Sequence, residues 1–318
     1  MYTQVNACTP EASRVHELWA LWVGKPDFLY CDMDEETFSS KFFGPQCLTL
    51  LHESGLAFSS GTYVPGNEYG YLTAVVTDPE ATGKGYGSEM LSALESEMQS
   101  RFGIKQMRII FFNPSTLSWE VPGNPGCLHP NSPGLDVDGP AYHFFTERGY
   151  CGFARQNSYF LKLSDYAPPD QIDTMKERLR QEGISIEVYD PDTMTGMAPM
   201  LEELGNPVWV KDILGEKSIK EGGRPILVPV KDGKVLGFTG PLDREKSGRG
   251  YFAGIAVSPE ARGKGVAKVL FSSLCSGLGD LGAGYMTLFT GETNPARRIY
   301  EAAGFRIVRT WDDMKKEL

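Results

Sequence analysis

The sequence lacks the features that mark several large classes of protein. Its six cysteines are scattered over 318 residues and form no C-x-x-C pair, which favours a reducing compartment over a disulfide framework. There are only four histidines, and none stands at a spacing typical of a metal site. No stretch approaches the roughly 18 apolar residues of a membrane-spanning helix. We therefore expect no bound metal and no membrane partner.

Positive charge is also scarce. The chain has 31 Lys and Arg residues against 41 Asp and Glu residues, which gives a formal net charge of −10. Proteins that bind nucleic-acid backbones need a basic face, so we expect no nucleic-acid partner. The acidic balance mildly favours a neutral or cationic small molecule. The first residues show no basic segment followed by an apolar run, and we expect a cytoplasmic protein.

What the sequence does contain is a long internal repeat. Residues 75–87 recur as residues 255–267, at an offset of 180. Similarity at one long period indicates a duplicated domain rather than a solenoid. The identical pairs in the two copies are Pro79 and Pro259, Glu80 and Glu260, Ala81 and Ala261, Gly83 and Gly263, Lys84 and Lys264, and Gly85 and Gly265.

Each copy of the repeat has the pattern of an apolar strand, a glycine-containing turn and the start of a helix. The first N–H groups of a helix have no intrahelical acceptor, so such a turn suits a phosphate or pyrophosphate. We hypothesise that it holds the pyrophosphate of coenzyme A. The candidate cofactor-binding residues are Ala256, Val257, Arg262, Gly263, Lys264, Gly265, Val266 and Ala267, with a second candidate site at Val76, Gly83, Lys84, Gly85, Tyr86 and Gly87.

The repeat predicts two domains of similar element order. We expect a first domain over residues 1–165, a linker and connecting helix over 166–183, and a second domain over 184–318. The two copies differ by about 25 residues in the spacing from the glycine turn to a later Gly-aromatic pair, which locates a Pro- and Gly-rich insertion at residues 113–140. Within it, His129 and Asp136 have two interpretations, contact with a substrate and simple solvation, of which we favour solvation. The predicted class is α/β (α+β).

The second half resembles the Gcn5-related N-acetyltransferases (GNAT). Residues 262–267 fit that family's coenzyme A motif, Gln/Arg-x-x-Gly-x-Gly/Ala, and residues 294–305 fit its later Asn, Ala-x-x-x-Tyr-x-x-x-Gly-Phe motif. The resemblance implies two tandem GNAT folds, each a mixed, mostly antiparallel sheet flanked by helices, with acetyl-CoA as co-substrate. Pairs of this kind include mycothiol synthase, and one half is often catalytically silent. Because Thr82 replaces the motif's Gln or Arg, we expect the second half to be catalytic.

The resemblance also implies a reaction, in which an acetyl group passes from the thioester to the amine of a small acceptor by direct attack. It places Tyr300 as the general acid for the departing thiolate, with Asn294 beside it, and an oxyanion-binding N–H near Ala256 or Val257. Asn294 is equally suited to cap the following helix. The general base stays open, with Asp243, Glu245, Glu292 and a water chain as the alternatives.

Two other functions are compatible with this pattern. One is a catalytically silent protein that binds acyl-CoA and acts as a regulator; the retention of Asn294 and Tyr300 argues against it. The other is an aminoacyl-tRNA-dependent transferase, which the acidic charge disfavours. The sequence leaves open the identity of the acceptor, the length of the acyl chain, and whether the chain is a monomer or a homodimer.

Overall fold

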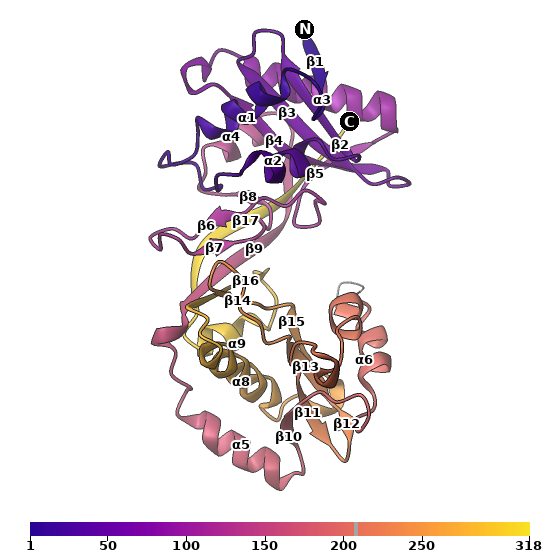
Figure 1. Ribbon diagram of the computed structural model, residues 1–318, viewed down its shortest axis with the longest axis vertical. Helices are drawn as coiled ribbons and strands as arrows, with labels where there is room; N and C mark the ends of the chain where they lie inside the picture. Colours follow the sequence, from indigo (N-terminus) through magenta and orange to yellow (C-terminus); the bar gives the residue numbers. More distant parts are fainter. Residues whose placement is uncertain (207–208) are drawn as a thin grey trace. The chain divides into compact units, whose positions relative to one another are not determined.

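The computed structural model describes residues 1–206 and 209–318. They form two compact units, of which the first contains Met1–Ser158 and Arg309–Leu318 and the second contains Tyr159–Val308 (Figure 1). The predicted class is confirmed, because each unit combines mostly antiparallel strands with flanking helices. None of the helices within the described ranges is long and apolar enough to cross a membrane.

The first unit contains strands β1 (Tyr2–Val5), β2 (Cys47–His52), β3 (Ala57–Tyr63), β4 (Tyr69–Thr77), β5 (Gln106–Ile109), β6 (Trp119–Glu120), β7 (Leu128–His129) and β8 (Leu135–Asp136). Its helices are α1 (Ala12–Ala20), α2 (Glu35–Phe42), α3 (Tyr86–Phe102) and α4 (Ala141–Thr146). Strands β1 to β5 are neighbours in chain order. Strands β9 (Cys151–Lys162) and β17 (Arg306–Glu317) each contribute residues to both units.

Helices cover both faces of the first sheet. Met90, Leu94 and Met98 of α3 are fully buried in one core cluster, together with Leu48 and Leu50 of β2. A second cluster joins α1 and α2 to the opposite face, and its buried members include Val15, Leu18, Trp19, Phe38 and Phe42. Because apolar side chains meet the sheet from both sides, β2 and β3 are buried over most of their length.

The end of the chain completes the first unit. The last residues of β17 pair antiparallel with β5, with Met314 opposite Ile109. Trp311 is fully buried, lies 5.1 Å from the ring of Trp119, and donates a hydrogen bond of 2.9 Å to Ser158. Residues 309–318 were expected to close the second domain. Their ladder with β5 and their buried tryptophan place them in the first unit instead.

The predicted insertion at residues 113–140 is an ordered part of the first unit. It contains β6, β7 and β8, and its Trp119 is fully buried and donates to the carbonyl of Asn131. Asp136 is only 9% exposed and His129 only 3%, which corrects the interpretation of both side chains as solvated. The high proline and glycine content therefore marks tight turns between short strands rather than an open loop.

The second unit contains strands β10 (Ser185–Val188), β11 (Leu227–Lys231), β12 (Lys234–Val235), β13 (Gly237–Gly240), β14 (Arg249–Gly250), β15 (Gly254–Val257) and β16 (Tyr285–Gly291). Its helices are α5 (Gln171–Gln181), α6 (Met197–Leu204), α8 (Val266–Asp280) and α9 (Arg297–Ala302). The predicted connecting helix is α5. The apolar side of α8, which includes Val269, Leu270 and Leu274, is fully buried.

Candidate active site

The strongest candidate site lies where two strands of the first unit separate. Strands β4 and β5 are parallel, but they pair only from Tyr69 to Tyr71. Two residues further on, β4 has a bulge, because Leu72 lies opposite Gly61 and Ala74 lies opposite Ser60. Thr73 is the extra residue. A bulge takes main-chain groups out of the regular ladder, so it leaves them available to a ligand in the gap between the strands.

Asn113, which follows the turn at the end of β5, holds this bulge in place. Its side-chain amide donates to the carbonyl of Leu72 and to the hydroxyl of Thr73, each at 3.2 Å. Its side-chain oxygen accepts from the Thr62 hydroxyl at 2.7 Å and from the Ser115 N–H at 2.9 Å. Four hydrogen bonds from one side chain therefore fix β3, β4 and the start of the insertion to one another.

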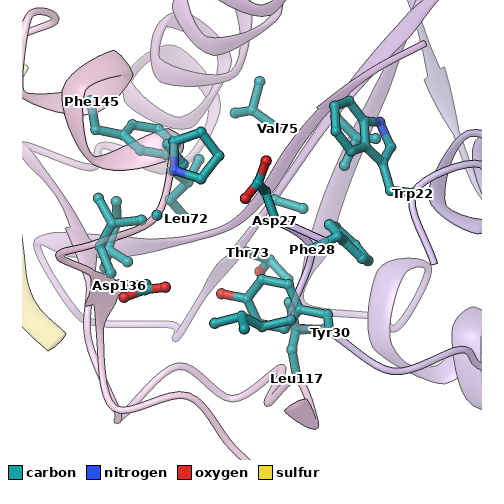
Figure 2. Close-up of a pocket in the computed structure, with 18 of the residues that line it drawn as sticks. Trp22, Asp27, Phe28, Tyr30, Leu72, Thr73, Val75, Leu117, Asp136 and Phe145 are labelled. Atoms are coloured by element: carbon teal, nitrogen blue, oxygen red, sulfur yellow. The ribbon is translucent and has the colours of Figure 1, made fainter. Parts of the chain in front are cut away.

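A cavity of about 230 Å³ occupies the gap. Most of its wall is apolar or aromatic, and its polar side chains come from the segment after α1, from β4 and from β8 (Figure 2). In Figure 2 the Tyr30 hydroxyl points across the cavity toward Asp136. The lining residues are Trp19, Trp22, Asp27, Phe28, Leu29, Tyr30, Leu72, Thr73, Ala74, Val75, Val76, Thr77, Ile109, Leu117, Leu135, Asp136, Gly139, Pro140, Ala141 and Phe145.

Asp136 has the environment of a proton acceptor. Burial raises the pKa of its carboxyl group above the ordinary value, while the charge of Arg309, 3.2 Å away, acts in the opposite direction. Its other oxygen accepts from the N–H of Asp138. Burial raises the pKa of the Tyr30 hydroxyl to about 12, so this group keeps its proton at neutral pH and can donate a hydrogen bond. The site thus offers one base and one neutral donor.

The glycine turn of the first unit begins next to this cavity. Val76 and Thr77 line the cavity, and the turn follows them along the chain. Gly83 and Gly85 have positive φ angles of 80° and 94°, and a Cβ atom added to either would meet nothing within 4 Å. Helix α3 starts directly after Gly85. The turn is therefore open, and its helix start can receive an anion.

The glycine turn of the second unit has the same backbone shape and is covered at Gly265, whereas a Cβ atom added to Gly263 would meet nothing within 4 Å. Gly265 has a φ of 86°, and a Cβ atom added there would lie 3.3 Å from the sulfur of Met175. Arg178 donates a hydrogen bond of 2.6 Å to the carbonyl of Lys264, whose ammonium group pairs with Glu182 at 3.1 Å. Met175 and Arg178 belong to α5, so this helix lies against the turn.

The strand position equivalent to the Thr73 bulge is also covered in the second unit. At the offset of 180 residues, Thr73 corresponds to Ala253. The indole N–H of Trp209 donates to the carbonyl of Ala253 at 3.0 Å. A Cβ atom added to Gly254 would lie 2.5 Å from that indole nitrogen. The Trp209 side chain therefore lies directly against this position of the second unit.

Comparison with known proteins identifies the family. A model described as the acetyltransferase (GNAT) family matches residues 10–118 and 194–305, one stretch in each unit and together more than half of the chain. The chain belongs to the GNAT family. The two matches confirm the tandem arrangement predicted from the repeat, and membership makes the chain an acyltransferase of class EC 2.3.1. No curated protein matches the sequence.

Several solved structures share the fold of this chain, and one of them is a tandem GNAT protein. A tandem GNAT protein from the clavulanic acid biosynthesis pathway aligns with a TM-score of 0.60 at 14% identity, over 100% of this chain and 98% of that one. A GCN5-related N-acetyltransferase from Sphaerobacter thermophilus aligns with a TM-score of 0.63 at 15% identity, over 99% of this chain and 95% of that one. A GCN5-related glucosamine N-acetyltransferase region of a fungal multi-domain GH3 beta-N-acetylglucosaminidase aligns with a TM-score of 0.68 at 15% identity, over 99% of this chain and 38% of that one.

These identities show the fold alone. This chain spans 38% of the length of the fungal protein, so the activity of that protein as a whole does not transfer directly.

The two residues predicted for catalysis in the second unit have different surroundings, because Asn294 lines an open cavity of about 530 Å³ whereas Tyr300 is buried. Tyr300 is 5% exposed, and its ring lies 5.1 Å from that of Phe271 and 6.1 Å from that of Phe252. Burial raises the pKa of its hydroxyl well above the ordinary value. Asn294 is exposed, and its side-chain oxygen accepts from the N–H of Ala296, which forms a turn ahead of α9 rather than the predicted cap, since the N-cap residue of α9 is Ala296. Their catalytic roles stay a prediction.

The other predicted residues of the second unit are placed as follows. Ala256 and Val257 lie in β15, and the Arg262 side chain donates to the carbonyl of Val257 at 3.2 Å. Val266 and Ala267 form the first turn of α8. Among the candidate bases, Asp243 pairs with Arg224 and Glu245 pairs with Arg249, while Glu292 is exposed. In the first unit, Lys84 is exposed and Tyr86 and Gly87 start α3.

The sequence did not single out Asp27, Tyr30, Thr73 or Asn113. Asp27 and Tyr30 lie in an irregular segment without periodicity, and Thr73 becomes special only through the register of β3 with β4. One signal was available for Asn113. Asn113-Pro114 follows β5 as Asn294-Pro295 follows β16, so the counterpart of Asn294 in the first half is the first residue of the predicted insertion. Among the described residues, no group of three or more His, Cys, Asp or Glu side chains is arranged to hold a metal.

Proposed function

We propose that the first unit is an N-acetyltransferase that moves the acetyl group of acetyl-CoA to the amine of a small acceptor by direct attack. One observation carries this proposal. A single cavity extends from Thr77, just ahead of an open glycine turn, to the buried carboxylate of Asp136. GNAT proteins generally use acetyl-CoA as co-substrate, which supplies the donor.

The residues of the first unit fit coenzyme A. The open turn at Gly83 and Gly85 and the start of α3 suit a pyrophosphate, since only glycine tolerates these backbone angles without strain. Lys84 is exposed in the middle of the turn and adds a positive charge. Between the turn and the bulge, the cavity wall runs along β4 through Thr77, Val76 and Val75, which suits a narrow and largely apolar chain.

Bound acetyl-CoA would supply an activated acetyl group and a thiolate leaving group. The chain's own residues would do the rest. Asp136 takes the proton of the attacking amine, because a buried carboxylate with a raised pKa is a stronger base than a solvated one. Tyr30 would donate a hydrogen bond, and a main-chain N–H taken out of the ladder by the Thr73 bulge would stabilise developing negative charge. The exposed Asp27 carboxylate attracts a cationic amine toward the cavity.

This proposal differs from the expectation that the second half is the catalytic one. In the second unit, α5 lies against the glycine turn, Trp209 covers the strand position equivalent to the bulge, and Tyr300 is buried. The second-unit site therefore remains the competing hypothesis. The experiment below distinguishes the two, because it changes one candidate residue in each unit.

The test is thiol release from acetyl-CoA in the presence of a panel of primary amines. Glucosamine belongs in this panel because the fungal structure named above is described as a glucosamine N-acetyltransferase region. We expect amine-dependent release by the wild type, a fall in kcat of about 100-fold or more for Asp136→Asn, and little change for Tyr300→Phe.

The matched control is Asp138→Asn. It makes the same chemical change in the same segment, on an exposed side chain that does not line the cavity. A normal rate in Asp136→Asn together with a large loss in Tyr300→Phe would move the reaction to the second unit. An absence of thiol release with every amine would refute the acetyltransferase assignment itself.

A further inference from the structure

A second and larger cavity lies beside the first in the same unit. Its volume is about 600 Å³, compared with about 230 Å³ for the first cavity. The segment after α1 forms one wall, and the β6–β7 hairpin of the insertion forms the other. The two cavities share Phe28, Leu29 and Tyr30 as a common wall. An acceptor that reaches the first cavity would therefore have this second space next to it.

Main-chain hydrogen bonds fix the common wall to the hairpin. The N–H of Glu120 donates to the carbonyl of Leu29 at 2.9 Å, and the N–H of Cys31 donates to the carbonyl of Ser118 at 3.0 Å. Tyr30 lies opposite Trp119 in this short antiparallel bridge. Because the hairpin holds the segment that carries Tyr30, it positions the wall that the two cavities share.

An ion pair also joins the two cavities. Asp136 lines the first cavity and Arg309 lines the second, and their side chains meet at 3.2 Å. An amine nitrogen placed at Asp136 would thus have the rest of its molecule close to Arg309. The geometry assigns the reacting group to the smaller cavity and the bulk of the acceptor to the larger one.

The walls of the two cavities differ in chemistry. The first is mostly apolar and aromatic, whereas the second carries the cations Lys25 and Arg309, the anions Asp32 and Glu120, and the amide of Asn124. Glu120 already accepts from the N–H of Gly126, and Arg309 pairs with Asp136, but the Nε atom of Arg309 is buried without a hydrogen-bond partner. A wall with charges of both signs and such an atom suits a polar ligand better than an apolar one.

We propose that the second cavity is the subsite for the body of the acceptor, and that the acceptor is a primary amine attached to a polar, hydrogen-bonding body too large for the first cavity. This inference rests on the proposed function of the first unit. A hydroxylated ring and a short peptide both have this chemistry. The experiment separates these two sources by using glucosamine as one probe and glycylglycine as the other.

The test compares these two polar amines with a short alkylamine, n-butylamine, in the full-length protein. The variant Lys25→Trp places a bulky ring at the wall of the second cavity, at an exposed position that does not line the first. We expect the wild type to prefer at least one polar amine, and Lys25→Trp to raise the KM of that amine about tenfold while the kcat/KM of n-butylamine changes less than twofold.

The matched control is Lys105→Trp, the same substitution at a strongly exposed lysine of the first unit outside both cavities. It should change neither the KM of the polar amine nor the kcat/KM of n-butylamine. Equal effects of Lys25→Trp on the polar amine and on n-butylamine would overturn the inference, and so would no effect on either. Turnover of n-butylamine without any preference for the polar amines would overturn it while leaving the proposed function intact. No turnover of any amine would refute both.

Discussion

The two glycine turns share six identical residues, yet their surroundings differ. Both have glycines with positive φ and both lead directly into a helix. In the first unit, nothing lies within 4 Å of a Cβ atom added at Gly83 or Gly85. In the second unit Gly263 is equally open, but Met175 and Arg178 of α5 lie against Gly265. The motif fixes the backbone shape, whereas neighbouring elements decide whether a ligand can reach it.

The same contrast holds at the split between the strands. The Thr73 bulge faces a cavity, while its counterpart Ala253 is bonded to the indole of Trp209. The covering residues Met175, Arg178 and Trp209 all come from segments outside the repeated stretch. Duplicated halves can therefore keep a binding motif while one copy serves the fold, and a retained motif alone does not identify the active half.

The two asparagines that follow β5 and β16 offer the largest contrast in stability. Asn113→Ala removes four hydrogen bonds and leaves the buried Thr62 hydroxyl without this acceptor, so we expect a loss of about 1–3 kcal/mol in the free energy of unfolding. Asn294→Ala removes one exposed local bond and should cost about 0.5 kcal/mol or less. Urea denaturation of both variants measures the difference. Equal losses of unfolding free energy in the two variants would contradict the view that Asn113 stabilises the place where β4 and β5 separate.

A smaller effect is expected on the pH dependence of the first unit. Asp136 must be ionised to act as a base, so kcat/KM should rise as pH rises through its pKa. Arg309 favours the ionised form. Arg309→Ala therefore raises the pKa of Asp136 and should move this acidic limb upward by about one pH unit. Arg309→Lys, which keeps the charge, should restore much of the shift.

A pH–rate profile distinguishes this electrostatic role from a loss of structure. Damage to the fold would lower kcat/KM at every pH without moving the limb. If the acidic limb of the kcat/KM profile stays at the same pH in Arg309→Ala, then either Asp136 is not the base or Arg309 does not influence its pKa.

Much of this architecture follows from local sequence patterns. The duplicated glycine turns, the tandem GNAT folds and the insertion near residues 113–140 were all predictable, because strand, turn and helix signals are carried by neighbouring residues. The site was harder to predict from the sequence. Asp27, Tyr30 and Asp136 come from irregular or inserted segments, and only tertiary packing brings them to one cavity. The covering of Gly265 by Met175 likewise depends on contacts far apart in sequence.

The pairing partner of the last strand also could not be predicted from local sequence signals. A β pattern over residues 306–317 predicts a strand but does not specify its neighbour. In the structure, Met314 pairs with Ile109, and Trp311 packs against Trp119, so the end of the chain belongs to the first unit. Arg309 reaches Asp136 only because of this return.

The central claim is that the first glycine turn, and not the second, receives acetyl-CoA. Calorimetric titration of acetyl-CoA into Gly85→Val and Gly265→Val tests it directly, since the two variants impose the same side chain at equivalent positions with φ angles of 94° and 86°. We predict that Gly85→Val abolishes detectable binding, whereas Gly265→Val keeps the affinity and stoichiometry of the wild type. Retained binding in Gly85→Val with loss in Gly265→Val would contradict the account.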